Sequence, residues 1–508
     1  MKNRISIYET GILVLGILLS IISAAICMQI MGQFGTTPNT SFIGAVLVMV
    51  VARIPLTIAK KFHNIERQNY VLSMASAAGF AAANCGFVAI ATMFVLGRSD
   101  LIIPMALGCL IGSMISVFVA GRLFDSKIFP ADGAWPSGVA IASTLEAGDE
   151  GGKKGWHLLQ GLAVGVIASF LGVPAAGVGI AFIANMVTMA ALGTGMIIRG
   201  YSTHMFGGFD VGQSNIAQGI MIGAGIVAFV QIFFTIGGNK SKASVTKTTP
   251  SKSLVSSICM FVGGAVAMAL VMGIFSEMGL QQSILWVVFA GASSIVVMVL
   301  VGTAIMHSGW GPTFAVVTIC LTIGLLAGFP PMPLAVLVGY LGSVGPCFGD
   351  TGVGLKAGWI IRGKGTDNTR EIYGRRQQVL IKQLGVFIGI AMAVVFGVML
   401  IHGNVIPPMS IFYADTVAST PSPYLLRELA LWAIPGAVLQ IVFGNRSAGI
   451  MLASGLLVNN PIFGISILVA IAARLIFGTK HMNVRAPGLI AGDGLFGFAE
   501  SVLRAFFN

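Results

Sequence analysis

The chain has 508 residues, of which 56% are hydrophobic and 9% are charged, with a net charge of +12. Soluble proteins carry roughly a quarter charged residues, so this composition excludes an ordinary soluble domain. The basic residues lie in short segments between apolar runs, which argues against a nucleic-acid interface. This distribution is typical of the positive-inside bias of membrane proteins.

Apolar runs long enough to cross a bilayer recur along the whole chain. In the first half they cover residues 11–31, 42–59, 70–97, 101–121, 155–171, 174–197 and 214–236. Lys2 and Arg4 precede the first run, and a basic segment at 60–67 separates the second from the third, so we expect a cytoplasmic N-terminus. The sequence therefore predicts an all-α polytopic protein of the cell (plasma or inner) membrane, with about 16 membrane segments.

Two polar segments interrupt the first half. Residues 129–150 contain Pro136, which suits the first turn of a helix. The apolar run after it is too short to span, so we expect a half-helix or a re-entrant element. The other segment, 201–214, holds His204, Asp210 and Gln213.

Residues 237–253 contain four lysines and no acidic residue, which predicts a basic cytoplasmic linker. It would join a first transmembrane half, 1–236, to a second, 254–508. In the second half the apolar runs cover 254–275, 284–304, 312–328, 332–348, 378–401, 424–443, 446–459, 462–478 and 487–506. The basic segment 362–382 is expected to be another cytoplasmic loop. Arg67-Gln68-Asn69 and Arg376-Gln377-Gln378 both open an apolar run, as expected for two related halves.

The strongest candidate site is the stretch 345–359, which carries Asp350 and Lys356 in an apolar neighbourhood. Its glycines include Gly349, Gly352 and Gly354. A charge in hydrocarbon is costly unless it faces a partner or a wet cavity, and glycines allow a break in the helix. We expect Asp350 to bind a coupling proton, with an ion pair to Lys356 or a helix cap as the alternative. Lys356 would bind a substrate carboxylate or extend to the interface.

Further polar residues are secondary candidates for the pathway. Glu146 ends the Pro136 helix and either faces the pathway or belongs to a solvated charge cluster. Ser137 and Gly138 could offer hydroxyl and backbone groups to a ligand. Asp493, between two glycines, repeats the pattern of Asp350. Asp210 could relay protons with His204, or the segment is a simple loop.

Cofactor and enzyme signatures are missing from the sequence. The histidines and six cysteines show no metal-ligand spacing, so we expect neither a metal site nor a cofactor. A phosphate-binding loop is also missing, so ATP would not power the protein directly. No nucleophile–base motif indicates an enzyme, and an intramembrane enzyme is a weak alternative.

Four elements follow one another in a fixed order along the chain. They are Arg67-Gln68-Asn69, Trp135-Pro136-Ser137-Gly138-Val139-Ala140, Asp350 with Lys356-Ala357-Gly358-Trp359, and Gly488-Leu489-Ile490-Ala491-Gly492-Asp493-Gly494-Leu495. This ordered set resembles the oligopeptide transporter (OPT) family, in a prokaryote-like form related to the yellow-stripe metal-chelate transporters. The chain departs from the family pattern at Val353 and Gly354, where glutamine and aspartate are usual.

The resemblance implies a secondary transporter. The expected activity is proton-coupled symport of short peptides, including glutathione-like ones, or of peptide-like metal chelates. The expected partners are that substrate, the coupling proton and the lipid bilayer, and a homo-oligomer is left open. A passive channel or facilitator for small solutes is the alternative.

Overall fold

The computed structural model describes residues 5–35, 37, 41, 44, 45, 48, 64–150, 152–238, 250–309, 311–419, 423–444, 448–479, 482 and 485–507. Most of the expected span 42–59 and most of the predicted linker 237–253 lie outside these residues. The division of the chain into 1–236 and 254–508 therefore stays a prediction.

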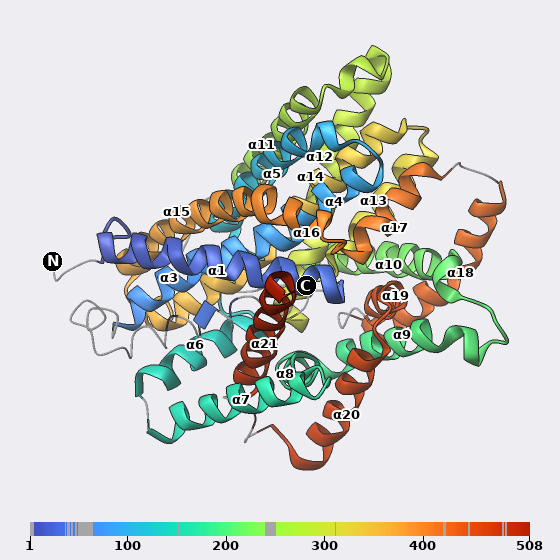
Figure 1. Ribbon diagram of the computed structural model, residues 1–508. Helices are drawn as coiled ribbons and strands as arrows, with labels where there is room; N and C mark the ends of the chain where they lie inside the picture. Colours follow the sequence, from blue (N-terminus) through green and yellow to red (C-terminus); the bar gives the residue numbers. More distant parts are fainter. Residues whose placement is uncertain are drawn as a thin grey trace.

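The described residues form helices and contain no strand, which confirms the predicted fold class (Figure 1). The long and medium helices are α1 (Thr10–Phe34), α3 (Ile65–Phe80), α4 (Val88–Val95), α5 (Ile102–Leu123), α6 (Pro136–Glu150), α7 (Gly152–Phe170), α8 (Ala175–Ile183), α9 (Met186–Met205), α10 (Ile216–Gly238), α11 (Pro250–Met272), α12 (Leu280–Ser308), α13 (Thr313–Leu326), α14 (Pro331–Ile361), α15 (Asn368–Met392), α16 (Val398–His402), α17 (Pro408–Ala418), α18 (Pro423–Phe443), α19 (Ala448–Leu457), α20 (Pro461–Phe477) and α21 (Arg485–Phe507). Two π-helical turns, η2 (Ala81–Phe87) and η6 (Ala393–Gly397), continue α3 into α4 and α15 into α16. In this part of the chain, eight helical segments are long and apolar enough to cross a membrane.

The first group of helices, here called the core bundle, comprises α1, α3–η2–α4, α5, α11, α12, α14 and α15. Helix α14 lies at its centre and contacts α3, α5 and α12. Every residue from 343 to 358 is buried. Pro331 occupies the first turn of α14, where its missing N–H costs nothing. Pro346 lies inside the helix, and proline is tolerated there in membrane helices because neighbouring groups satisfy the freed carbonyl.

The second group, here called the paired bundle, comprises α7–α10 and α18–α21. Its helices pair in reverse order: α7 with α21, α8 with α20, α9 with α19, and α10 with α18. Glycines allow the backbones to approach closely. A Cβ on Gly195 would lie 2.9 Å from the Cα of Gly455, and one on Gly492 would lie 3.0 Å from the Cα of Gly165. Small residues at such contacts are the usual way membrane helices associate.

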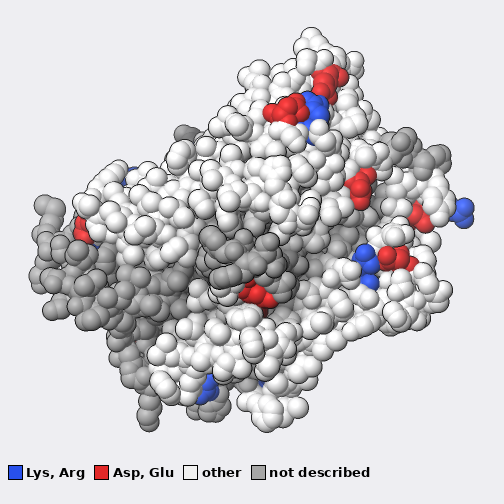
Figure 2. All heavy atoms as spheres, viewed as in Figure 1, with Lys and Arg blue, Asp and Glu red and all other residues white. Residues whose placement is uncertain are grey.

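Both bundles contain helices from the beginning and the end of the chain. Helices α3 and α15, which carry the two related Arg-Gln segments, pack against each other in the core bundle. Helix α6 contacts both α14 and α7 and so connects the bundles. The surface in Figure 2 shows charged side chains only in small clusters between wide uncharged areas. Large apolar side chains on α18, such as Ile434 and Val442, are 63% and 68% exposed, which suits contact with lipid.

Candidate functional site

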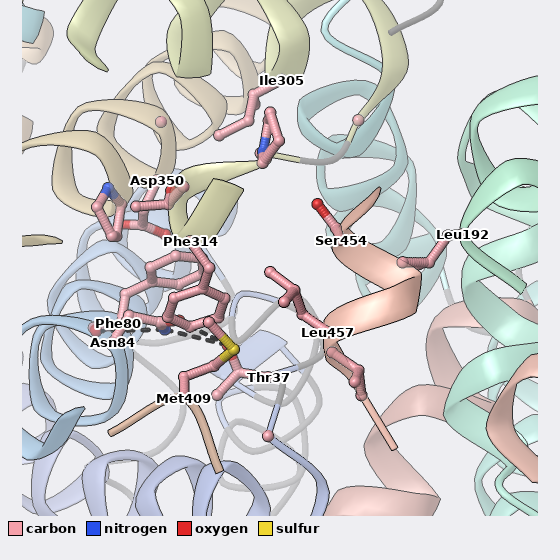
Figure 3. A pocket seen from close by; sticks show the side chains of 18 of the residues that line it. Thr37, Phe80, Asn84, Leu192, Ile305, Phe314, Asp350, Met409, Ser454 and Leu457 are labelled. Atoms are coloured by element: carbon pink, nitrogen blue, oxygen red, sulfur yellow. Dashed lines mark hydrogen bonds between the residues drawn. The ribbon is translucent and has the colours of Figure 1, made fainter. Parts of the chain in front are cut away.

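A cavity lies where the core bundle meets the paired bundle. Phe80, Asn84 and Asp350 lie on one side of it, and Ser454 and Leu457 of α19 lie on the other (Figure 3). The remaining lining residues are Gly35, Thr37, Leu192, Met196, Ile305, Gly309, Gly311, Pro312, Thr313, Phe314, Pro346, Gly349, Val353, Met409 and Val458. The cavity measures about 90 Å³, and the empty space is about 930 Å³ when the open solvent at its mouth is included.

Helix α14 presents Pro346, Gly349, Asp350 and Val353 to this cavity. Their spacing of three and four residues places them on one face of a helix. Asp350 is only 4% exposed. Of the site residues predicted from the sequence, the structure places two, Asp350 and Gly349, on the cavity wall.

The Asp350 carboxylate is held by three side chains from other segments. Lys382 of α15 forms an ion pair with it, and the Ser76 hydroxyl of α3 donates a hydrogen bond to it. The Ser41 hydroxyl lies 3.5 Å from the same carboxylate. The Lys382 ammonium also donates to the Asp350 carbonyl at 3.2 Å. The alternative reading, an ion pair of Asp350 with Lys356, is wrong, because the buried partner of Asp350 is Lys382 of the next helix.

The sequence alone did not indicate Lys382 as a site residue, because it ends a basic segment that resembles a solvated loop. In the structure the loop between α14 and α15 is short and covers only residues 362–367. Helix α15 begins at Asn368, where the Asp367 side chain caps it by accepting from the Arg370 N–H at 3.0 Å. Gln378 and Lys382, four residues apart, then share the face directed toward α14. Gln378 donates to the Gly354 carbonyl at 2.6 Å and to the Ser73 hydroxyl at 2.9 Å. The capping aspartate was the signal that could have placed both residues.

The expected helix break at 345–358 is also wrong, because α14 is a continuous helix through this stretch. Its glycines make room for neighbouring side chains instead. A Cβ on Gly352 would lie 2.5 Å from the Trp135 ring, and one on Gly354 would lie 2.7 Å from the Cε of Lys382. A Cβ on Gly349 would collide with Ile305 of α12. Dense packing on all sides keeps the helix intact despite the poor helix propensity of glycine.

Lys356 points away from the cavity, toward the turn before α6. Its ammonium donates to the carbonyls of Ala131 and Gly133 at 2.7 and 2.9 Å and lies 4.7 Å from the centre of the Trp359 ring. Helix α6 packs beside it: a Cβ on Gly138 would lie 2.7 Å from the Cβ of Lys356. The geometry gives Lys356 a structural contact with the 131–133 turn, in place of the substrate contact or the extension to the interface expected from the sequence.

The structure distributes the other candidates over separate places. Ser137 is buried at the start of α6 and donates to the Gly309 carbonyl at 3.0 Å, next to the cavity. Glu146 is exposed near the other end of α6, as in the solvated alternative. Asp210 caps a short turn and pairs with Arg199 at 2.5 Å, while His204 is exposed, as in the simple-loop alternative. None of these lines the cavity in the described part of the chain.

Asp493 lies in the paired bundle, where α21 meets the start of α8. Its carboxylate accepts a hydrogen bond from the Ser169 hydroxyl and another, at 2.6 Å, from the Ala176 N–H in the first turn of α8. A carboxylate stabilises the N-terminus of a helix by accepting its free N–H groups. Asp493 therefore serves as a helix cap supplied by another helix, and the structure does not bring it together with Asp350.

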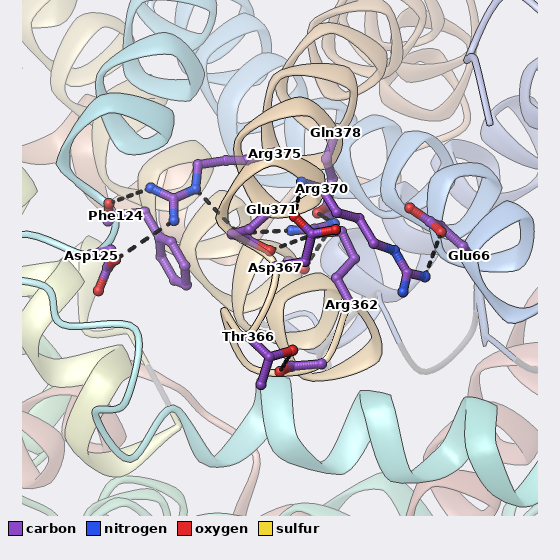
Figure 4. A network of polar contacts seen from close by, with 12 residues as sticks. Glu66, Phe124, Asp125, Arg362, Thr366, Asp367, Arg370, Glu371, Arg375 and Gln378 are labelled. Atoms are coloured by element: carbon purple, nitrogen blue, oxygen red, sulfur yellow. Dashed lines mark hydrogen bonds and ion pairs between the residues drawn. The ribbon is translucent and has the colours of Figure 1, made fainter. Parts of the chain in front are cut away.

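A second polar cluster surrounds the turn between α14 and α15 (Figure 4). Arg362 is 1% exposed and contacts both carboxylate oxygens of Glu371, at 2.7 and 3.2 Å. Arg375 contacts the same carboxylate at 3.3 Å and lies 3.9 Å from Asp125. Partial burial raises the pKa of the Asp125 carboxyl above its usual range, although the positive charge of Arg375 acts to lower it. The sequence placed these residues in a solvated loop, whereas the arginine–glutamate pair is buried.

Within the described residues, no three or more His, Cys, Asp or Glu side chains come together to hold a metal ion. Asp350 is the one charged side chain among the described residues that line the cavity. Asp350 is thus the ionisable group on the wall of this cavity, and the buried Lys382 is its counter-ion.

An all-helical membrane protein with a mainly apolar cavity between two bundles has the architecture of a membrane transporter. Residues 10–239 match the family model described as OPT oligopeptide transporter protein. The match lies in the first half of the chain and includes the Arg67 and Trp135 elements. No curated protein sequence matches the chain. The relation to prokaryote-like members and to yellow-stripe transporters stays a prediction.

Proposed function

We propose that the protein is a proton-coupled symporter that carries short peptides, glutathione-like peptides or peptide-like metal chelates across the cell membrane, with its N-terminus in the cytoplasm. The observation that carries this proposal is the buried Asp350–Lys382 pair, whose aspartate lines the cavity. An ionisable pair at such a place is the usual element of proton pathways in membrane proteins.

Protonation of Asp350 would change the charge balance of this wall. The groups that face the carboxylate are Lys382 from α15, Ser76 from α3 and Ser41. A neutral Asp350 leaves the Lys382 ammonium buried without its counter-ion, which costs several kcal/mol. Water or an anionic group of the substrate can offset this cost, so proton binding and substrate binding favour each other.

The two bundles provide a means of alternating access. One wall of the cavity belongs to α14 of the core bundle and the other to α9 and α19 of the paired bundle. A relative rotation of the two bundles would open the cavity to each side in turn, as in transporters that move one bundle against another around a fixed site. Helix α6, which contacts both bundles, would adjust during this motion.

Purified protein in proteoliposomes tests the proposal. Labelled trialanine, glutathione and an iron(III)–peptide chelate are offered with and without an inward proton gradient, and protein-free liposomes serve as the control. We expect at least one of these probes to accumulate above its external concentration only when the gradient is present. Downhill equilibration that ignores the gradient would instead support a passive facilitator.

A further inference from the structure

A groove lies between α7 and α21 on the surface of the paired bundle. It has a volume of about 620 Å³, and its wall includes Trp156, Leu159 and Val164 from α7 and Arg485 and Leu489 from α21. The three residues from α7 are 61%, 51% and 54% exposed, so the groove opens to the surroundings of the protein. It shares no lining residue with the cavity that contains Asp350.

Arg485 is the one charged side chain among the described residues that line this groove. Its guanidinium donates hydrogen bonds to the side-chain oxygen of Gln160 at 2.9 and 3.2 Å and to Nδ1 of His157 at 2.9 Å. Gly161 allows the two helices to meet here, because a Cβ on it would collide with the Arg485 carbonyl oxygen. These contacts fix a positive charge on an otherwise uncharged wall, where it would attract an anion. Arginine is well suited to phosphate groups, which match the fork of its N–H donors.

The charged end of the groove lies where both helices begin. Helix α21 starts at Arg485, and Trp156 lies in the second turn of α7. The helices run in parallel, since Gly161 packs against Arg485 and Gly165, one turn further on, packs against Leu489. Tryptophan is enriched at membrane–water interfaces. We therefore place Arg485 and Trp156 at the level of the lipid headgroups, with the rest of the groove extending into the hydrocarbon.

An apolar stripe continues from the groove along α7. Its exposed members follow one another at intervals of three and four residues, which places them on one face of the helix. They are Trp156, Leu159, Ala163, Ile167 and Phe170. At 1.5 Å per residue the stripe is about 20 Å long, and half of the hydrocarbon core is about 15 Å thick. The stripe is therefore long enough to hold one acyl chain.

We propose that this groove binds an anionic phospholipid such as phosphatidylglycerol, with its phosphate at Arg485 and one acyl chain along the stripe on α7. Basic pockets between membrane helices bind anionic headgroups in this way. The ammonium group of a zwitterionic lipid would be repelled by the guanidinium, so the preferred lipid has a net negative charge. This lipid site does not depend on the proposed transport function.

Quenching of tryptophan fluorescence by brominated lipids tests the proposal. The full-length protein is reconstituted in phosphatidylcholine bilayers that contain increasing fractions of phosphatidylglycerol or phosphatidylcholine brominated in the upper part of the acyl chains. The Trp156→Phe variant supplies the signal of the other tryptophans, which is subtracted. We expect the Trp156 signal to be half quenched at an at least threefold lower fraction of the anionic lipid. Equal quenching by the two lipids would overturn the proposal.

Variants of Arg485 provide the matched controls. Arg485→Gln should abolish the preference for the anionic lipid, whereas Arg485→Lys, which keeps the positive charge, should retain it. Arg427→Gln removes an exposed arginine of α18 that does not line the groove and should leave the preference unchanged. An undiminished preference in Arg485→Gln would contradict the site.

A soluble competitor distinguishes a lipid from a free phosphate. Excess glycerol 3-phosphate should not change the quenching, because it lacks the acyl chains that the stripe would hold. Competition by glycerol 3-phosphate would show that the groove binds a soluble phosphate and would overturn the lipid site. If Arg485→Gln does not fold, the comparison of the two lipids on the unmodified protein, with and without this competitor, decides.

Discussion

Replacement of Lys382 by glutamine probes the energetic importance of the buried pair. The two side chains are 0% and 3% exposed, so solvent screens their attraction very little. Removing one partner of such a pair leaves the other charge buried and unpaired, which costs about 3–5 kcal/mol. The Ser76 and Ser41 hydroxyls remain beside Asp350 and offset part of this cost, so we expect a loss near the lower value.

Thermal or denaturant unfolding in detergent measures this loss, and a double-mutant cycle isolates the interaction. Asp350→Asn alone should also destabilise the protein, because it leaves the Lys382 ammonium unpaired. The double variant Asp350→Asn/Lys382→Gln should recover most of the stability, since neither charge remains. If the losses of the two single variants simply add in the double variant, the pair contributes no coupling energy and the reasoning is refuted.

Three further predictions concern other parts of the fold. Gly195→Ala should destabilise the paired bundle by about 1–3 kcal/mol through overpacking. Gly263→Ala is the control and should leave stability unchanged, because Gly263 has open space around it. Unfolding measurements on both variants check this prediction. Arg362→Gln should lower the free energy of unfolding by about 3 kcal/mol, because Glu371 loses a buried two-point contact. Arg375 still contacts that carboxylate. Unchanged stability of the variant would contradict the burial of the Arg362–Glu371 pair. Burial raises the pKa of the Asp125 carboxyl in the folded protein. The protonated carboxyl therefore contributes to the free energy of unfolding below the ordinary carboxyl pKa. This contribution is lost as the pH rises through the raised pKa. Asp125→Asn should therefore be more stable than the unmodified protein at neutral pH and lose this advantage in acid, as unfolding across pH would show.

Fold class and the position of the main candidate could be predicted from the sequence because they depend on local signals. Long apolar runs require helices in a bilayer, and the isolated Asp350 stood out against them. The short α6 begins at Pro136 as predicted, because proline is compatible with only a few helix positions. In each case the physical cause lies within a few residues of the feature.

Predictions failed where the cause was tertiary. The partner of Asp350 comes from a helix whose start looked like part of a loop, and only packing shows that Lys382 is buried. The glycines of α14 were expected to break the helix, yet Trp135 and Ile305 fill the space beside them. Asp493 resembles Asp350 in sequence but caps α8. No sequence pattern distinguishes an aspartate that caps a distant helix from one that faces a cavity.

The most direct test of the central claim compares active accumulation with exchange in proteoliposomes that contain Asp350→Asn. With trialanine as the probe, the account predicts that this variant loses accumulation driven by a proton gradient but still exchanges internal for external peptide, because the cavity remains and the proton site is removed. Lys356→Gln, whose ammonium faces the Ala131 and Gly133 carbonyls and not the carboxylate, is the control and should still accumulate the peptide. Undiminished proton-driven accumulation by Asp350→Asn would contradict the claim that this carboxylate couples the proton to transport.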